Sequence, residues 1–254
     1  MNKPLVSIIM PCYNAERFVS YAIESIITQT YPNWELLITN DCSTDSSLNI
    51  IKHYIQQEPT RIKCFTNACN SGAAASRNHG INRAHGEYIA LLDADDIWLP
   101  HKLEQHIEFI LEKQCAISYT AYGFINEDGQ PVGKIYYPPL QADYRRLLRS
   151  NIIGASSVIV RTDVMKDNLF ADNVFHEDYT SWLSIVKTHG TACGLLEPLT
   201  MYRTLQGSKS DNKLRSAHGV YNIYRRHLKF SIPVSLWYMI FYTYYGIKKY
   251  SLRS

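Results

Sequence analysis

The chain has 254 residues, 46% of them hydrophobic and 19% charged, and its net charge is +3. This composition excludes general disorder and suits one globular α/β domain, with or without an appendage. The charge is uneven, because residues 203–254 hold ten basic residues and one acid while residues 1–202 carry an excess of acids. An acidic body with a basic tail indicates an anionic partner for the tail.

The first apolar run, Leu5–Met10, is too short for the core of a signal peptide, and no cleavage signature follows it. We therefore expect a cytoplasmic protein. The six cysteines are scattered without a C-x-x-C pair, which favours free thiols over a zinc site.

Strands and helices alternate through the first half of the chain. Short apolar runs rich in branched residues predict strands at 5–10, 34–39, 62–66 and 88–92. Apolar residues at helical spacing predict a helix after each of the first three strands, with Asn14 and Ser43 as N-caps of the first two and Ala73–Ala84 as the third. This alternation predicts βαβ units and a mostly parallel sheet.

The second half is less regular. We expect a helix over 99–111, strands at 116–119 and 156–160, a helix over 178–187 and a strand at 192–196. The segment between residues 120 and 175 has no readable pattern.

Polar clusters follow three of the predicted strands: Tyr13-Asn14, Asp41 and the acids from Asp93 to Asp96. Ligands of parallel sheets bind beyond the carboxyl ends of the strands, so we expect these clusters to meet at one edge. An aromatic ring such as Tyr13 can stack on a nucleobase and Asp41 can accept a base N–H, although ordinary packing of Tyr13 is equally compatible.

Asp93, Asp95 and Asp96 repel one another unless a cation lies between them. Mg²⁺ or Mn²⁺ would relieve that repulsion, because these ions prefer carboxylate and phosphate oxygens. The alternative is a solvated turn with a helix N-cap. A P-loop and a G-x-G-x-x-G motif after the first strand are both missing, which argues against a P-loop kinase and a nicotinamide dehydrogenase.

Five ordered motifs resemble those of the family 2 inverting glycosyltransferases of the GT-A fold, whose mostly parallel, Rossmann-like sheet is flanked by helices. The motifs span residues 6–16, 40–45, 70–72, 76–80 and 86–96. The resemblance covers residues 4–112 strongly and 150–210 more loosely.

The resemblance implies a nucleotide-sugar site, with a UDP-sugar favoured as donor. Its donor-binding residues would be Pro11, Tyr13, Asn14, Glu16, Asp41, Arg77, Asp93 and Ala94. Within this set Asp41 would accept the uracil N3–H, Arg77 would lie near the base and phosphates, and Asp93 would contact the ribose. Asp95 would bind the Mn²⁺ or Mg²⁺ that bridges the diphosphate.

The same resemblance assigns the catalytic base to Asp178, with Glu177 orienting the acceptor or the base. A single carboxylate base opposite a metal-held leaving group implies inversion. The alternative is that both acids simply favour a helix N-terminus. Arg203, Ser208 and Lys209 are further candidates for acceptor or phosphate contacts, and the alternative is that Arg203 and Lys209 are ordinary surface charges.

Residues 230–247 hold no charge and many aromatic residues, and Arg225, Arg226, Lys229, Lys248 and Lys249 flank them. As a helix they would span roughly 27 Å, slightly short of a bilayer crossing. We expect residues 225–249 to lie on an anionic membrane surface, or alternatively to pack on the domain. No RNA-binding motif accompanies them, so no nucleic-acid partner is expected.

These observations predict a GT-A domain over 1–202, with a donor half (1–112) and an acceptor half (113–202), and a helical, basic and aromatic extension over 203–254. The predicted function is sugar transfer from a nucleotide donor to a glycan or lipid-linked glycan of a cell-surface polysaccharide, at the inner face of the cell membrane. A sugar nucleotidyltransferase and a non-catalytic binding module remain as alternatives.

Overall fold

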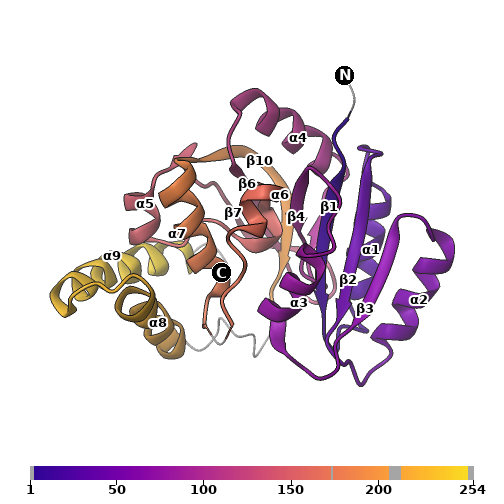
Figure 1. Cartoon of the computed structure of the whole chain (residues 1–254), viewed down its shortest axis with the longest axis horizontal. Helices are drawn as coiled ribbons and strands as arrows, with labels where there is room; N and C mark the ends of the chain where they lie inside the picture. Colours follow the sequence, from indigo (N-terminus) through magenta and orange to yellow (C-terminus); the bar gives the residue numbers. More distant parts are fainter. Residues whose placement is uncertain (1–2, 173, 206–212, 251–254) are drawn as a thin grey trace.

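A computed structural model describes residues 3–172, 174–205 and 213–250. One ten-stranded mixed sheet runs through the molecule in the order β3-β2-β1-β4-β9-β6-β10-β5, with β7 on β6 and β8 on β10 (Figure 1). The strands are β1 (Val6–Cys12), β2 (Trp34–Asn40), β3 (Ile62–Thr66), β4 (Tyr88–Leu91), β5 (Ile97–Trp98), β6 (Ile117–Ile125), β7 (Pro131–Tyr136), β8 (Gln141–Ala142), β9 (Val158–Arg161) and β10 (Ala192–Arg203).

The four strands predicted from the first half pair in parallel. Successive side chains of β1 enter opposite cores: Ile8 and Met10 pack on one face of the sheet and Ile9 on the other. Helices α1 (Val19–Ile27), α2 (Ser47–Gln57) and α4 (Lys102–Lys113) cover the first face, while α3 (Gly72–Ile81), α5 (Tyr144–Arg149), α6 (Thr162–Lys166) and α7 (Glu177–His189) cover the second. The carboxyl ends of β1, β2 and β4 therefore lie at the same edge of the sheet.

Both predicted N-caps in this half are wrong. Helix α1 begins at Val19 and α2 begins at Ser47, each a full turn later than expected. Asn14 instead has a positive φ of 48° within the loop after β1. The Ser43 hydroxyl accepts a hydrogen bond from the Asn14 N–H rather than from its own helix. The side-chain oxygens of Asn14 and Ser43 therefore accept hydrogen bonds from the neighbouring loop instead of capping a helix.

The sheet becomes mixed beyond β4, because β9 runs antiparallel to both β4 and β6. Strands β6 and β10 are longer than the predicted runs and pair in parallel with bulges. Strands β5, β7 and β8 and helices α5 and α6 were not predicted. The acids from Asp93 to Asp96 lie in a turn that leads into β5, so they cap no helix.

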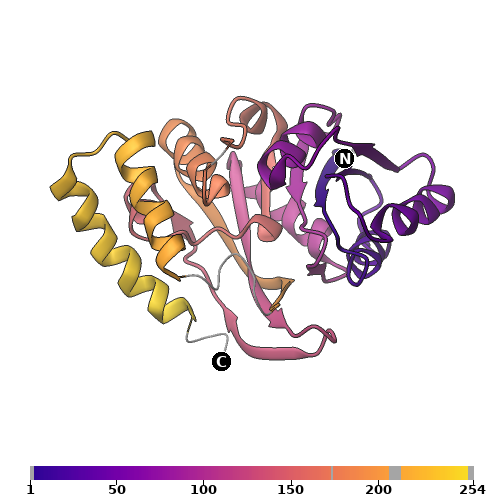
Figure 2. The ribbon, with the colours of Figure 1, turned by 90° about the horizontal axis from the view of Figure 1, so that it is seen from below.

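The last described elements are helix α8 (Lys213–Asn222), a π-helical turn over Ile223–His227, and α9 (Ile232–Tyr250). These elements lie together at the end of the molecule away from β3 (Figure 2). Tyr224 is fully buried, and Tyr238 and Tyr242 of α9 pack against the same core. No helix within the described residues is long and apolar enough to cross a membrane.

Candidate functional site

Hydrogen bonds tie together the loops that follow β1 and β2. The Asn14 N–H donates to Ser43 Oγ at 3.1 Å, and Asn14 Oδ1 accepts from the Thr44 N–H at 2.8 Å. Glu16 Oε2 accepts from the Ser46 N–H at 2.9 Å, beside the start of α2. The side chains of Asn14 and Glu16 thus hold the loop backbone, while Tyr13, which precedes them, is 50% exposed.

Asp41 lies at the end of β2 and is buried. Its Oδ1 accepts from Asn67 Nδ2 at 2.7 Å and from the Ser71 N–H at 2.9 Å, and its Oδ2 accepts from the Gly72 N–H at 2.7 Å. Gly72 has a φ of +85°, a conformation that glycine adopts without strain. A carboxylate offers about four acceptor positions, so about one remains for a ligand. Pro11, two residues along β1 from Ile9, lies at the same edge and pairs with Thr39.

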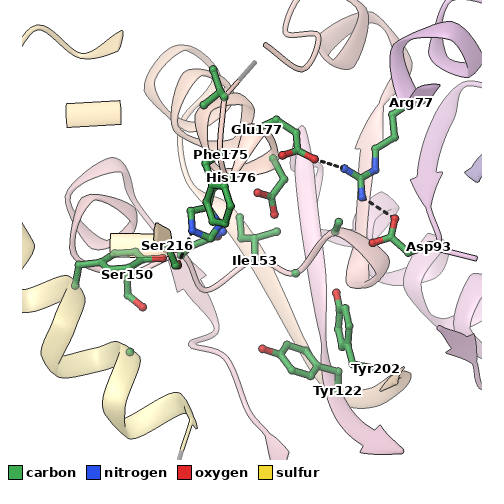
Figure 3. A pocket seen from close by; sticks show the side chains of 17 residues that line it. Arg77, Asp93, Tyr122, Ser150, Ile153, Phe175, His176, Glu177, Tyr202 and Ser216 are labelled. Carbon is green, nitrogen blue, oxygen red and sulfur yellow. Dashed lines mark hydrogen bonds and ion pairs between the residues drawn. The ribbon is translucent and has the colours of Figure 1, made fainter. Parts of the chain in front are cut away.

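Arg77 joins the two halves of the protein. Its guanidinium is nearly buried and donates to Asp93 Oδ1 at 2.6 Å and to Glu177 Oε1 at 2.9 Å (Figure 3). The two carboxylates offset the cost of burying the cation and raise the pKa of Arg77. This bridge fixes the end of β4 against the start of α7, which the motif spacing alone does not reveal.

The neighbouring acids Asp95 and Asp96 have different surroundings. Asp96 is buried, and its carboxylate accepts from Ser156 Oγ at 2.6 Å and from the Arg203 N–H at 2.9 Å. Asp96 therefore joins the acid turn to β10. The Asp95 carboxylate, in contrast, accepts no hydrogen bond from another residue of the described chain. Burial and the charge of Asp93 raise the pKa of Asp95 to about 6.

This arrangement suits a divalent cation completed by ligand oxygens. No group of three His, Cys, Asp or Glu residues within the described ranges could hold a metal by itself. Mg²⁺ in phosphate-binding sites usually takes only one or two carboxylates and completes its shell with water and phosphate. Asp95, unpaired and raised in pKa, has the chemistry expected of such a ligand, whereas Ala94 beside it is buried and contributes packing.

A cavity of about 350 Å³ lies between this edge of the sheet and α7. Arg77, Asp93, Glu177 and Asp178 all line it, so the structure brings these four predicted residues together (Figure 3). Asp178 Oδ1 accepts the Tyr179 N–H at 2.8 Å. Burial, followed by the adjacent Glu177, raises the pKa of Asp178.

Two tyrosines that were not among the predicted site residues form another wall of the cavity. The rings of Tyr122 on β6 and Tyr202 on β10 meet edge to face at 4.7 Å between centroids. The Tyr202 hydroxyl is buried and has no hydrogen-bond partner in the described part of the chain. It lies so close to Gly154 that a Cβ there would be only 2.2 Å away, so glycine is required at that position. An aromatic wall suits the apolar face of a sugar ring.

Arg203 has structural partners on every side. It is buried, its Nε donates to the Asp95 carbonyl at 2.9 Å, and its Nη1 donates to the carbonyls of Asn126 and Glu127. It is therefore not an ordinary surface charge. Ser208 and Lys209, the other candidates of this segment, lie outside the described residues.

Comparisons with known proteins agree with this geometry. Residues 7–164 match the sequence model described as glycosyl transferase family 2. The chain is 35% identical to the glycosyltransferase TuaG of Bacillus subtilis (strain 168), named for teichuronic acid biosynthesis, over 97% of this chain and 98% of TuaG. It is 36% identical to WfgD of Escherichia coli, over 99% of this chain and 97% of WfgD. WfgD is named a UDP-Glc:alpha-D-GlcNAc-diphosphoundecaprenol beta-1,3-glucosyltransferase.

Two solved structures share the fold. Residues 1–349 of TarS from S. aureus, in complex with UDP-GlcNAc, superpose with a TM-score of 0.69 at 20% identity, over 86% of this chain and 65% of that one. The mannosyltransferase PcManGT of Pyrobaculum calidifontis, in complex with GDP-Man and Mn²⁺, gives a TM-score of 0.69 at 15% identity, over 91% of this chain and 66% of that one.

Proposed function

Because the chain belongs to glycosyl transferase family 2, we propose that it transfers a sugar from UDP to a hydroxyl of a lipid-linked glycan during synthesis of a cell-surface polysaccharide. The observation that carries the proposal is the cavity in which Asp178 lies beside the Arg77-bridged pair Asp93 and Glu177. The name of WfgD, a full-length relative, supports both the UDP donor and the diphospholipid-linked acceptor.

Asp178 is proposed as the general base. The acceptor oxygen attacks the anomeric carbon as its proton moves to the Asp178 carboxylate. The bond from that carbon to the diphosphate oxygen breaks, and the leaving UDP takes the electron pair. Attack opposite the leaving group inverts the anomeric centre. Oδ1 already accepts the Tyr179 N–H, which leaves Oδ2 for the proton, and the raised pKa makes the carboxylate a stronger base.

The other candidate residues are proposed to bind and orient the donor. Glu177 and Asp93, held through Arg77, position the acceptor side and the ribose side of the cavity relative to each other. Pro11, Tyr13 and the remaining acceptor position of Asp41 would contact the base at the edge formed by β1 and β2. Residues 1–112 would thus supply most of the donor site, and residues 113–202 most of the acceptor site.

Asp95 is proposed to hold Mn²⁺ or Mg²⁺ together with the donor diphosphate. A bound cation would stabilise the negative charge that develops on the departing diphosphate. We expect UDP to bind wild-type protein more tightly with Mn²⁺ than with a chelator, and the difference to shrink in Asp95→Ala. Calorimetric titration of UDP measures this, and an unchanged metal effect in the variant would remove Asp95 from the role.

One assay separates the proposed reaction from its alternatives. Purified protein is incubated with UDP-glucose and a synthetic N-acetylglucosaminyl diphosphate carrying an alkyl chain, and nuclear magnetic resonance identifies the products. Transfer predicts UDP and a disaccharide with an inverted linkage. A nucleotidyltransferase would instead release a sugar phosphate in exchange for UTP. A binding module would leave the donor intact, and either of these results would overturn the proposal.

We propose that helix α9 lies on the anionic inner surface of the cell membrane. Leu236, Ile240, Tyr244 and Ile247 recur at three- and four-residue spacing, and each is more than half exposed, as is Trp237. This apolar stripe lies opposite the side of α9 that packs on the core, and basic residues at 225, 226 and 229 precede the helix.

Sedimentation with vesicles tests the membrane contact. We expect wild-type protein to bind phosphatidylglycerol vesicles, and Trp237→Asp/Ile240→Asp to lose most of that binding. Leu111→Asp, at an exposed leucine on α4, is the matched control and should bind as wild type does. Wild-type protein that stays in the supernatant would refute the contact.

A further inference from the structure

A second cavity, of about 320 Å³, lies between α5, the segment after β7 and helix α9. Arg146, Arg149 and Lys248 line it. The rest of its wall is uncharged: three tyrosines, two prolines, an isoleucine and a serine. None of the described lining residues is acidic. The closest acid in the sequence, Asp143, is the N-cap of α5, and its carboxylate accepts the Arg146 backbone N–H at 2.7 Å.

Three cations around one cavity select a ligand with more than one negative charge. Arg146 and Arg149 are one turn apart on α5, so their side chains project from the same side of the helix. The Arg149 guanidinium lies over the Phe241 ring of α9, 5.3 Å from its centroid, which restrains the side chain. Guanidinium groups form paired hydrogen bonds with phosphate oxygens, so a phosphate or diphosphate fits this lining best.

The position of this basic cavity relates it to the reaction. Ser150 lines both the basic cavity and the catalytic cavity that contains Asp178. Helix α9 also contributes to both, with Tyr242 and Gly246 at the catalytic cavity and Tyr245 at the basic one. Figure 3 shows Ser150 beside this helix, at the side of the cavity away from Arg77. The opposite side of α9 carries the exposed apolar stripe.

We infer that the basic cavity binds the diphosphate that links the acceptor sugar to its lipid. The inference rests on the proposed function, and it adds where the anionic part of the acceptor lies. The sugar occupies the catalytic cavity, the diphosphate lies beyond Ser150 among Arg146, Arg149 and Lys248, and the lipid follows α9 towards the membrane. Because the two cavities share a wall residue, the accepting sugar is the one attached directly to the diphosphate.

Binding of decyl diphosphate, a probe without a sugar, tests the site directly. Calorimetry is carried out with saturating UDP, so that the donor site is occupied. We expect Arg146→Glu/Arg149→Glu to weaken binding at least about tenfold, since each charged contact contributes appreciably to affinity. Arg146→Gln/Lys248→Gln keeps the Arg149–Phe241 contact and should weaken binding in the same direction. Arg145→Glu, also exposed on α5 but outside the cavity, is the matched control and should bind as wild type does.

A wild-type protein that does not bind the probe, or charge variants that bind it equally well, would overturn the inference. Binding to phosphatidylglycerol vesicles tests whether the cavity instead binds the phosphate of membrane headgroups. If the variants lose vesicle binding but keep wild-type affinity for decyl diphosphate, the cavity binds membrane headgroups and the inference is wrong. Hydrolysis of UDP-glucose without acceptor reports separately on the proposed reaction, and the variants should retain it.

Discussion

The loops after β1 and β2 and the catalytic cavity both depend on carboxylates, but they use them differently. In the loops, Glu16 and Asp41 each accept hydrogen bonds from backbone N–H groups, and these bonds fix the backbone. Asp95 in the acid turn and Asp178 in the cavity instead lie near other acids and have raised pKa values. The loop carboxylates build the site by holding backbone from another segment, whereas within the described residues Asp95 and Asp178 accept no hydrogen bond from a distant segment and are left for metal or proton.

The largest expected effect is on catalysis, at Asp178. Asp178→Asn keeps the shape of the side chain but cannot accept the acceptor proton. We expect the transfer rate to fall by roughly 10²–10⁴-fold, the range for loss of a general base. UDP affinity and the unfolding temperature should stay close to wild type. Rates with a saturating acceptor measure the effect. Asp163→Asn, an exposed acid paired with Arg161, is the control, and a wild-type rate in Asp178→Asn would exclude the assignment.

Asp41 should show the opposite behaviour, a loss of stability. Asp41→Asn replaces one acceptor oxygen by an NH₂ group that faces backbone N–H donors. We expect the free energy of unfolding to fall by about 1–3 kcal/mol, the cost of leaving buried donors unsatisfied. Urea unfolding without ligand measures this. Asp45→Asn changes a more exposed carboxylate of the same loop and should lower the free energy of unfolding by less. An equal loss in the two variants would contradict the proposed importance of the Asp41 hydrogen bonds.

The smallest expected effect is a gain in stability at Asp95. Its pKa is about 6 in the folded protein and 3.8 ordinarily. The unfolded chain therefore releases this proton more readily, and stability falls as the pH rises from about 4 through 6. Asp95→Asn removes that penalty. The free energy of unfolding of the metal-free protein should therefore rise by about 1–2 kcal/mol at pH 7.5, a figure reduced for the partial exposure of the side chain, and should hardly change near pH 4.

Thermal unfolding in a chelator at both pH values checks this expectation. Addition of Mn²⁺ and UDP should reverse the order and make wild type the more stable protein. A variant that is less stable than wild type at pH 7.5 without metal would show that Asp95 is a structural acid like Asp96.

The first half of the fold could be predicted because its strands are continuous apolar runs and its ligand-facing residues follow them directly. Convergence of Asp41 and Asp93 on one edge follows from parallel pairing alone. The detailed roles of nearby polar residues could not be predicted, since Asn14 and Ser43 bond across loops instead of capping helices.

The second half was predicted only in part. Helices α4 and α7 and strands β6, β9 and β10 match expected elements, but the rest takes its order from contacts between distant segments. Strand β5 has two residues and exists only because it pairs with β10. Tyr202 was assigned no role from the sequence, although it directly precedes the candidate Arg203, and its place in the cavity depends on Gly154. The structural role of Asp96 could not be predicted from sequence, because it depends on its partners Ser156 and the Arg203 N–H.

The pairing of β5 with β10 also has a consequence for how the chain folds. Met201 pairs with Ile97, and Asp96 accepts the Arg203 N–H, so the acid turn is completed by residues about a hundred positions later. Such non-local closure slows folding, because chain entropy is lost before the contacts form. On the ribosome, the donor edge cannot reach its final form until β10 has emerged. A chain cut after residue 112 would expose the sides of β4 and β5 and should aggregate instead of binding nucleotide.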